Sequence, residues 1–383
     1  MIELPRLNSK WSVIFFLLPS VNLYFFNIGY IKPFLIIWKS MVILISMYIF
    51  YKYINKFSII LMIFTFINIF SSFVNRNISI GIIYSSFVLL STCIYISYLS
   101  KYDFKELITG MYYMYSFIII ANFLSMTLYP DGISQKDGIF PIYLLGGKNA
   151  IQMILLPSIY IIYLYSYTIY EKMKIIPFIV ILISVISMYM SESGTGVTVS
   201  IASMIFLLMY KKINLKGKTY ILIYILIFFS IVVFRLQEVL FKEFIVDILH
   251  KDITLTGRVY IWDLVLKNIK MIGLIGLGRG NTFILDNFYL RVNETHNGFL
   301  EVFLYSGIIG LTIFLIMVWM IIKKLDKYYG IHSKILSFGI FTYMIIGISE
   351  SAFYKMELWI IFSIAYNIEY IVRKQNTKEL KYI

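Results

Sequence analysis

Residues 298–322 read GFLEVFLYSGIIGLTIFLIMVWMII, an apolar run of 25 residues in which Glu301 is the one charged side chain. A transmembrane helix needs about 20 mostly apolar residues, because the hydrocarbon core of a bilayer is about 30 Å thick and each helical residue rises about 1.5 Å. The run therefore predicts a membrane-spanning helix. The whole chain has the same character: 60% of its 383 residues are hydrophobic, 14% are charged and the mean hydropathy is +0.83.

Further apolar runs predict an all-α integral membrane protein with about twelve transmembrane helices. The candidate spans are residues 12–30, 34–51, 57–74, 78–99, 107–129, 149–169, 175–191, 194–210, 219–235, 298–322, 335–349 and 358–372. We interpret 1–383 as a single polytopic membrane domain, with 236–297 as a large extracytoplasmic loop between the ninth and tenth spans. The first run is expected to be retained, because no small-residue cleavage site of a signal peptide follows it.

The basic residues predict the orientation of the chain, since Lys and Arg in short loops remain on the cytoplasmic side. With the N-terminus inside, the inner segments hold 20 of the 34 Lys and Arg residues. Both termini are then expected to be cytoplasmic. The net charge of +14 follows from this topology and from contact with anionic membrane lipid. It does not indicate nucleic-acid binding, for which the charge forms no stripe and no motif is present.

Arginine is concentrated in the long outer loop. The chain has 27 Lys but seven Arg, and four of the seven lie between residues 235 and 291. A guanidinium fork suits bidentate binding of phosphate, whereas Lys offers a point charge. Residues 238–250 and 258–272 each predict an amphipathic helix at the membrane interface, and Arg258 would begin the second. The alternative is that both helices merely pack against the bundle.

A glycine cluster and a histidine complete this loop. Gly273, Gly276, Gly278 and Gly280 predict a tight turn, since the strand and downstream acid of a dinucleotide fold are missing. His296 precedes the tenth span and could accept a proton from a hydroxyl nucleophile. The alternative is an interfacial histidine that caps a helix.

No cofactor or metal is expected. Zinc would need three or four protein ligands, the single Cys93 lies within a predicted span, and the chain has no GxxxxGK[ST] phosphate loop.

A second outer segment, residues 129–148, ends in Gly146-Gly147-Lys148-Asn149 at the start of the sixth span. Its glycines would let backbone amides at a helix N-terminus approach an anion, with Lys148 beside them. The alternative is a turn followed by a helix that Asn149 caps.

These motifs, in this order, resemble a known family. GR-x3-W at 257–262, the glycine cluster, HN-x-[FYL]-L at 296–300 and SGIIGL at 306–311 are similar to the O-antigen polymerase and ligase superfamily of bacterial envelope glycan assembly. Weaker similarities are GKNA at 147–150 and SESGTG at 191–196. In the latter, Gly194 stands where many relatives have Arg, so one phosphate contact of the family is in doubt, and Lys148 or Arg291 would have to replace it.

The resemblance implies a metal-independent membrane glycosyltransferase, GT-C-like in fold, of the bacterial cytoplasmic membrane. Its substrate would be a polyprenyl-diphosphate-linked oligosaccharide, and a chain-length regulator and a flippase would act in the same pathway. Arg258 and His296 would be catalytic. The diphosphate would be bound by Arg258, Arg279, Arg291 and Lys148, and the supporting residues would be Asn149, Trp262, Gly278 and Asn297.

Three functions compete on this basis. A polymerase adds a growing chain to one new repeat unit of an O antigen, capsule or exopolysaccharide, and this is the function that we favour. A ligase moves the finished glycan to its acceptor. A flippase or transporter would be expected to carry ionisable groups within its spans and to have short loops, whereas here these groups gather in one outer loop.

Overall fold

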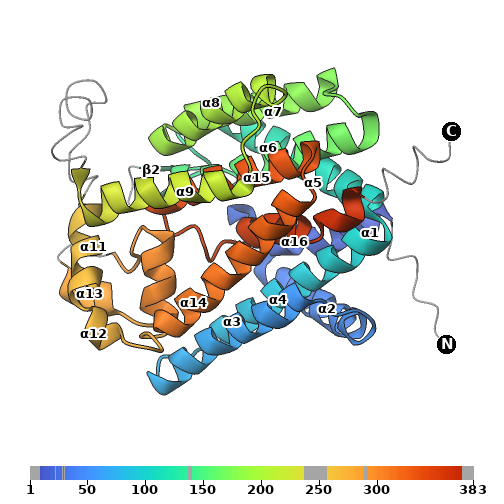
Figure 1. The fold of residues 1–383 in the computed structure, drawn as a ribbon. Coiled ribbons are helices and arrows are strands. Elements are labelled where there is room, and N and C mark those ends of the chain that lie inside the picture. Colours follow the sequence, from blue (N-terminus) through green and yellow to red (C-terminus); the bar gives the residue numbers. More distant parts are fainter. Residues whose placement is uncertain are drawn as a thin grey trace.

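The computed structural model describes residues 9–21, 23–27, 29, 31–136, 140–236, 257–288 and 292–372, and these residues are mostly helical. Figure 1 shows the bundle that they form. The elements, in chain order, are α1 (Lys10–Leu17), η1 (Leu18–Ser20), η2 (Tyr24–Asn27), α2 (Ile31–Lys52), α3 (Lys56–Val74), α4 (Ile80–Tyr102), α5 (Phe104–Leu128), β1 (Ser134–Lys136), β2 (Phe140–Ile142), α6 (Lys148–Tyr170), α7 (Ile175–Met190), α8 (Gly194–Met209), α9 (Gly217–Phe228), η3 (Phe229–Val233), α11 (Arg258–Lys267), α12 (Ile269–Ile272), α13 (Phe283–Asn287), α14 (Gly298–Lys327), α15 (Ile331–Ser349) and α16 (Met356–Tyr366).

The described helices confirm an all-α membrane protein. Seven of them are long and apolar enough to cross a bilayer: α2, α3, α4, α5, α6, α14 and α15. The other five predicted spans overlap apolar helices of 10–17 residues. The chain is therefore a multi-pass membrane protein, and the number of twelve spans remains a prediction.

The first predicted span, 12–30, is wrong in extent. Its helical part, α1 with η1, ends at Ser20, and the separate short turn η2 follows. Pro19 lies at the start of η1. A proline has no amide hydrogen to donate and its ring clashes with the preceding turn, which explains why the α-helix does not continue.

The bundle has a buried centre and a lipid-facing periphery. Of the most apolar 18-residue stretch of each helix, 89% is buried inside the protein in α6 and 22% in α2. The hydroxyl of Tyr160 in α6 lies 2.6 Å from Ser203 Oγ of α8 and accepts a hydrogen bond of 2.8 Å from Thr342 of α15. Such interhelical hydrogen bonds contribute about 0.6 kcal/mol each within a membrane bundle, and they fix α6 at the centre.

Helix α14 is interrupted at Gly307, whose backbone adopts φ 62° and ψ −161°. The break is filled by residues 273–280, here called the glycine segment. The amides of Leu277 and Gly278 donate to the carbonyls of Leu304 and Tyr305 at 2.8 and 3.0 Å. In return, the amides of Ile308 and Ile309 donate to the carbonyls of residues 273 and 274 at 3.2 and 3.0 Å. Backbone groups freed within a bilayer must find protein partners, and the glycine segment supplies them.

The glycine segment is also hydrogen-bonded to the turn between α3 and α4. Asn75 and Asn77 donate side-chain hydrogen bonds of 3.0 and 2.7 Å to the carbonyls of Gly276 and Leu277. The predicted tight turn is confirmed, since Gly273, Gly276 and Gly278 all have positive φ. These contacts hold α11, α12 and α13 at one end of the bundle, beside α14 (Figure 1).

Candidate functional site

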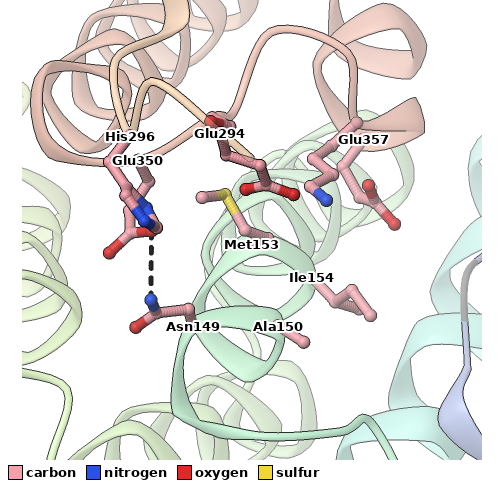
Figure 2. A pocket seen from close by; sticks show the side chains of 10 residues that line it. Asn149, Ala150, Met153, Ile154, Glu294, His296, Glu350 and Glu357 are labelled. Carbon is pink, nitrogen blue, oxygen red and sulfur yellow. Dashed lines mark hydrogen bonds and ion pairs between the residues drawn. The ribbon is translucent and has the colours of Figure 1, made fainter. Parts of the chain in front are cut away.

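A cavity of about 140 Å³ lies where α6 meets the segment before α14 and the loop between α15 and α16. We call it the Glu350 cavity. It is lined by Asn149, Ala150, Met153, Ile154, Glu294, His296, Glu350, Ser351, Lys355 and Glu357. Figure 2 shows α6 along one wall and the ionisable side chains along the other. All of these loops fall on the membrane face that the charge pattern assigns to the outside.

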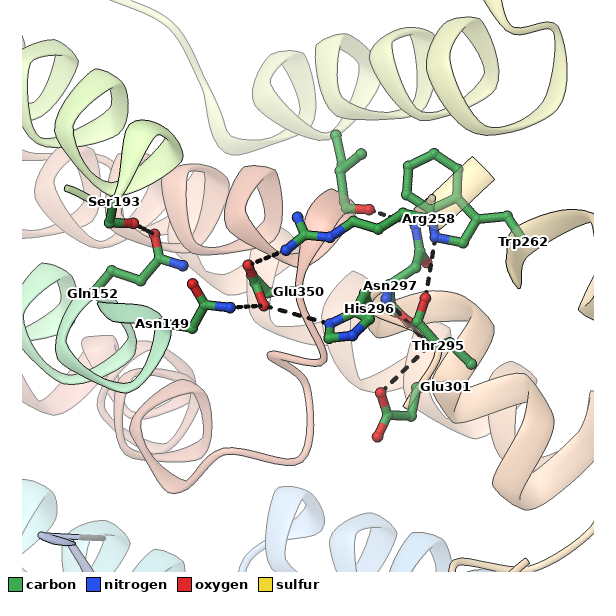
Figure 3. Close-up of polar contacts among 11 residues, drawn as sticks. Asn149, Gln152, Ser193, Arg258, Trp262, Thr295, His296, Asn297, Glu301 and Glu350 are labelled. Carbon is green, nitrogen blue, oxygen red and sulfur yellow. Dashed lines mark hydrogen bonds and ion pairs between the residues drawn. The ribbon is translucent and has the colours of Figure 1, made fainter. Parts of the chain in front are cut away.

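Glu350 joins three parts of the chain through its carboxylate (Figure 3). One oxygen accepts a hydrogen bond of 2.8 Å from Nη2 of Arg258, at the start of α11. The other accepts one of 3.0 Å from the Asn149 side chain and lies 3.8 Å from Nδ1 of His296. The Glu350 side chain is 7% exposed and that of Arg258 is 21% exposed. A charge at this depth is costly unless it is paired and hydrogen-bonded, so Arg258 stabilises the carboxylate.

His296 is held in an unusual backbone conformation, with φ at 48°. The residues on either side fix it: Thr295 Oγ accepts from the amide of Asn297 at 3.1 Å, and the Asn297 side chain donates to the carbonyl of Ile348 at 2.9 Å. Asn297 also caps α14, because its side chain accepts from the amide of Leu300 at 3.0 Å. Left-handed conformations at non-glycine residues persist where the surroundings enforce them, and they cluster at functional sites. The predicted alternative, in which His296 caps the helix, is therefore wrong.

The imidazole of His296 lies beside Glu350 with its Nδ1 buried, and this atom has no hydrogen-bond partner among the described residues. An unpaired buried nitrogen next to a carboxylate is poised to bond it after a small rotation. Catalytic hydrogen bonds are often long in the absence of substrate. The arrangement leaves Nε2 as the ring nitrogen that can face a substrate.

The family model for O-antigen ligase matches residues 178–315. The matched segment begins in α7 and ends in α14, and it contains Arg258, the glycine segment and His296. This match supports the similarity of the chain to the O-antigen polymerase and ligase superfamily. A comparison with curated proteins gives no match. The family that matches is one of membrane enzymes that transfer glycans.

The start of the second predicted loop helix agrees with the superfamily motif. Helix α11 begins at Arg258, and Trp262 is buried one turn later. The Trp262 indole donates a hydrogen bond of 3.1 Å to the carbonyl of Thr295, beside His296. Arg235, at the end of η3, forms an ion pair with Asp263 of the same helix. Trp262 therefore connects the helix that carries Arg258 to the segment that carries His296.

The predicted helix over 258–272 exists, although it divides at Asn268 into α11 and α12. Asn268 has φ −102° and ψ 21°, outside the helical region, and its side chain donates to the carbonyl of Leu264 at 2.8 Å. The other predicted amphipathic helix, 238–250, and Arg291 lie outside the described residues.

Asn149 has a different role from the predicted cap. Helix α6 begins at Lys148 and its cap position is Gly147, so Asn149 lies in the first turn and its side chain reaches Glu350. Lys148 is exposed at the same helix end, but it does not line the Glu350 cavity. In the neighbouring 191–196 motif, Ser193 caps α8 and donates a hydrogen bond of 2.7 Å to Gln152 of α6.

Arg279 is held apart from the residues that line the cavity. Its guanidinium donates to Ser85 Oγ at 3.2 Å and lies over the ring of Tyr354, 5.0 Å from the centroid. Its backbone amide donates to Ser72 Oγ at 2.9 Å. Tyr354 belongs to the loop that contributes Ser351 and Lys355 to the cavity, so Arg279 supports this loop from α3 and α4. A Cβ at the neighbouring Gly278 would collide with the backbone of Ser72, which explains the small residue.

Sequence reasoning missed Glu350, the centre of the network, which also lies outside the matched segment. A signal was present. The loop ESAFYKME at 350–357 follows an apolar span directly and carries two carboxylates, and both line the cavity. Ionisable residues at the end of a transmembrane helix commonly mark a functional site.

An apolar groove of about 440 Å³ lies near the same site, between α9, α11, α12 and α14. Its lining is almost entirely hydrocarbon and aromatic: Tyr224, Ile225, Phe228, Phe229, Leu266, Ile269, Phe299, Leu300, Phe303, Leu311 and Leu315. Phe299 and Leu300 follow His296 within four residues, so the groove begins close to the histidine.

Proposed function

We propose that this protein polymerises polyprenyl-diphosphate-linked oligosaccharide repeat units at the outer face of the bacterial cytoplasmic membrane. The observation that carries the proposal is the convergence of His296 and Arg258 on the buried carboxylate of Glu350, at the edge of a cavity. The product would be an O antigen, a capsule or an exopolysaccharide. The family match supports glycan polymerisation or ligation in general.

His296 would act as the general base. It takes the proton from a hydroxyl of the acceptor sugar, whose oxygen then bonds to the anomeric carbon of the donor. The bond from that carbon to the diphosphate breaks, and the diphosphate leaves with the electron pair. The activated diphosphate bond supplies the free energy, so the reaction itself needs no nucleotide.

Glu350 would position His296 and stabilise the imidazolium that forms. A carboxylate next to Nδ1 selects the tautomer in which Nε2 is free to accept a proton, as in other acid–histidine pairs. Asn149, from a helix far away in the sequence, holds the same carboxylate oxygen. Glu350 and Asn149 are therefore positioning residues for the base.

Arg258 would bind the donor diphosphate. Negative charge builds on the leaving group in the transition state, and a fixed cation stabilises this charge more than the ground state. Lys148 and Arg291 are further candidate contacts. For Arg279 to serve in the same way, its guanidinium would have to leave Ser85 and Tyr354. The apolar groove beside His296 fits the polyprenyl chain of the donor, because it offers hydrocarbon and aromatic surface at the end of α11 opposite Arg258.

A ligase is the second candidate, because the matching family model is described as O-antigen ligase and does not separate the two activities. A ligase would use the same base and the same diphosphate contact but would transfer a finished glycan to its final acceptor. A chain-length regulator and a flippase would be partners in either case.

Deletion of the gene in the native host, followed by gel analysis of the surface glycan, separates these functions. A polymerase predicts that the ladder collapses to single repeats and that wild type, but not His296→Ala, restores it. Long lipid-linked chains that never reach an acceptor would indicate the ligase instead. The complete absence of outward-facing lipid-linked glycan would overturn both and favour a flippase.

A further inference from the structure

The Glu350 cavity has a second polar side, away from Arg258, that the proposed chemistry does not use. Glu294, Lys355 and Glu357 line it, and we call it the Glu357 side. Figure 2 shows Glu357 across the cavity from His296 and Glu350, with Glu294 between them. The cavity volume of about 140 Å³ equals the space of roughly five water molecules in the liquid. That is a suitable volume for part of a single sugar ring.

Glu357 is the unusual residue of this side. It is only 2% exposed, and its Oε1 has no hydrogen-bond partner in the part of the chain that the structure describes. The hydroxyls of Tyr115 and Tyr343 are also buried without a partner among those residues, and both interact electrostatically with Glu357. A buried polar atom left unpaired costs about 1–3 kcal/mol, and each such atom in a folded protein needs an explanation.

A bound sugar would satisfy the unpaired oxygen of Glu357, which lines the cavity. A carboxylate accepts hydrogen bonds at two oxygens, with about four lone-pair sites, and sugar hydroxyls are donors in close array. Lys355 lies near enough to Glu357 for electrostatic interaction and could donate to a ring or hydroxyl oxygen. Met153 and Ile154 of α6 form the apolar floor, on which the C–H face of a sugar could rest.

The charges of the cavity are divided. Arg258 lies on the Glu350 side, where the proposed function has the anionic diphosphate. The Glu357 side carries two carboxyl groups, Glu294 and Glu357, against one ammonium group, Lys355. A sugar that carries a carboxylate would meet like charge there, and the juxtaposition of like charges disfavours its binding.

We propose that the Glu357 side of the cavity binds the acceptor sugar, and that its carboxyl groups select a neutral or amine-bearing sugar over one that carries a carboxylate. This inference rests on the proposed function, since it assigns the sugar whose hydroxyl His296 deprotonates. Glu357 and Glu294 accept hydrogen bonds from hydroxyls next to the reacting one, and so they turn the reacting hydroxyl toward Nε2 of His296.

The test uses the purified full-length protein in phospholipid nanodiscs and saturation-transfer NMR. The probes are the methyl glycosides of a neutral hexose, a 2-amino hexose and a hexuronic acid. We expect NMR saturation transfer to the first two glycosides. The uronic acid should bind at least about tenfold more weakly. Glu357→Gln should weaken binding of the neutral glycoside about tenfold, as expected for a lost hydrogen bond to a charged group.

Two further variants keep the test decisive. Glu294 is exposed, so Glu294→Gln should fold even if Glu357→Gln does not, and it should also weaken binding. Glu192→Gln is the matched control, because Glu192 is an exposed glutamate just before α8 that does not line the cavity. Glycoside binding by this variant should equal that of wild type. Equal binding of the uronic acid, or wild-type binding in both cavity variants, would overturn the proposal.

Failure of the subsite and failure of the enzyme are distinguishable. His296→Ala should strongly reduce glycan polymerisation while retaining glycoside binding, because the base is not part of the Glu357 side. If gene deletion left the glycan ladder unchanged while glycosides still bound through Glu357, the proposed polymerase would fail and the sugar site would stand. If the ladder required the gene but binding ignored Glu357 and Glu294, the sugar site alone would fail.

Discussion

The surroundings of Glu350 and the glycine segment each hold one of the arginines that the sequence predicts to bind diphosphate. They hold these arginines in different ways. Arg258 is paired with a single carboxylate that also contacts Asn149 and lies near His296. Arg279 is bound by the hydroxyl of Ser85 in α4 and by the ring of Tyr354. The first arrangement gathers polar side chains at a cavity, and the second joins backbone to backbone by hydrogen bonds. Two arginines in similar glycine-flanked motifs therefore differ in what they can do.

The largest effect is expected from His296→Ala. We expect polymer formation to fall by about 10²–10⁴-fold, which is the usual contribution of a general base, while the amount and thermal stability of the folded protein stay near wild type. The measurement is the rate of transfer with purified enzyme and lipid-linked repeat units. His332→Gln is the matched control, because His332 is a buried histidine that bonds Thr168. A wild-type rate for His296→Ala would contradict the role of the cavity.

Arg258→Ala should come next, with two separable consequences. Loss of the diphosphate contact should raise the donor KM and lower kcat. Loss of the charge should also leave Glu350 uncompensated and cost about 1.5–3 kcal/mol of folding free energy, as for a hydrogen bond to a charged group. Thermal unfolding of the double variant Arg258→Ala with Glu350→Gln should recover stability without recovering activity. Equal instability of the single and double variants would show that the pair is not coupled.

Gly276→Ala should act on the other region and destabilise the fold. Gly276 has φ 77°, and a Cβ there would lie 2.5 Å from the backbone nitrogen of Gly307. We expect a loss of about 1–3 kcal/mol from the backbone strain alone, seen as a lower melting temperature and a smaller folded yield. Gly330→Ala is the control, since nothing lies within 4 Å of its Cβ position and its backbone is extended. Normal stability of Gly276→Ala would mean that the glycine segment does not fill the break tightly.

Arg279→Ala should have the smallest effect and sharpen the comparison most. It removes a cation–π contact worth about 0.5–1 kcal/mol and a hydrogen bond to Ser85, so a modest drop in melting temperature is expected. Transfer per folded molecule should change little. A large rise in donor KM at unchanged stability would instead identify Arg279 as a second diphosphate contact.

The sequence by itself determined the class of fold and part of the site. Composition and the length of apolar runs are local properties, and they predicted the seven long helices because the bilayer sets a fixed length for a span. The concentration of arginine before an apolar run likewise marked the segment that contains Arg258 and His296. The predicted extent of the first span was wrong because a turn at Pro19 ends a helix that composition alone would continue.

Only the tertiary structure decided which polar groups meet. Asn149 and Glu350 are separated by 201 residues and yet share a hydrogen bond. Neither the residue type of Glu350 nor its position in the sequence marks it as a partner of His296. The break in α14 was hidden for the same reason, since its missing hydrogen bonds are supplied by residues about thirty positions earlier. Arg258 and Arg279 look alike along the chain, but their partners differ. Arg258 bonds Glu350 after α15, and Arg279 bonds serines of α3 and α4. The periodicity of apolar residues indicates which face of a helix a residue occupies. Which side chains pair across the bundle depends on how the helices pack, and the order of residues along the chain does not give the distances between helices.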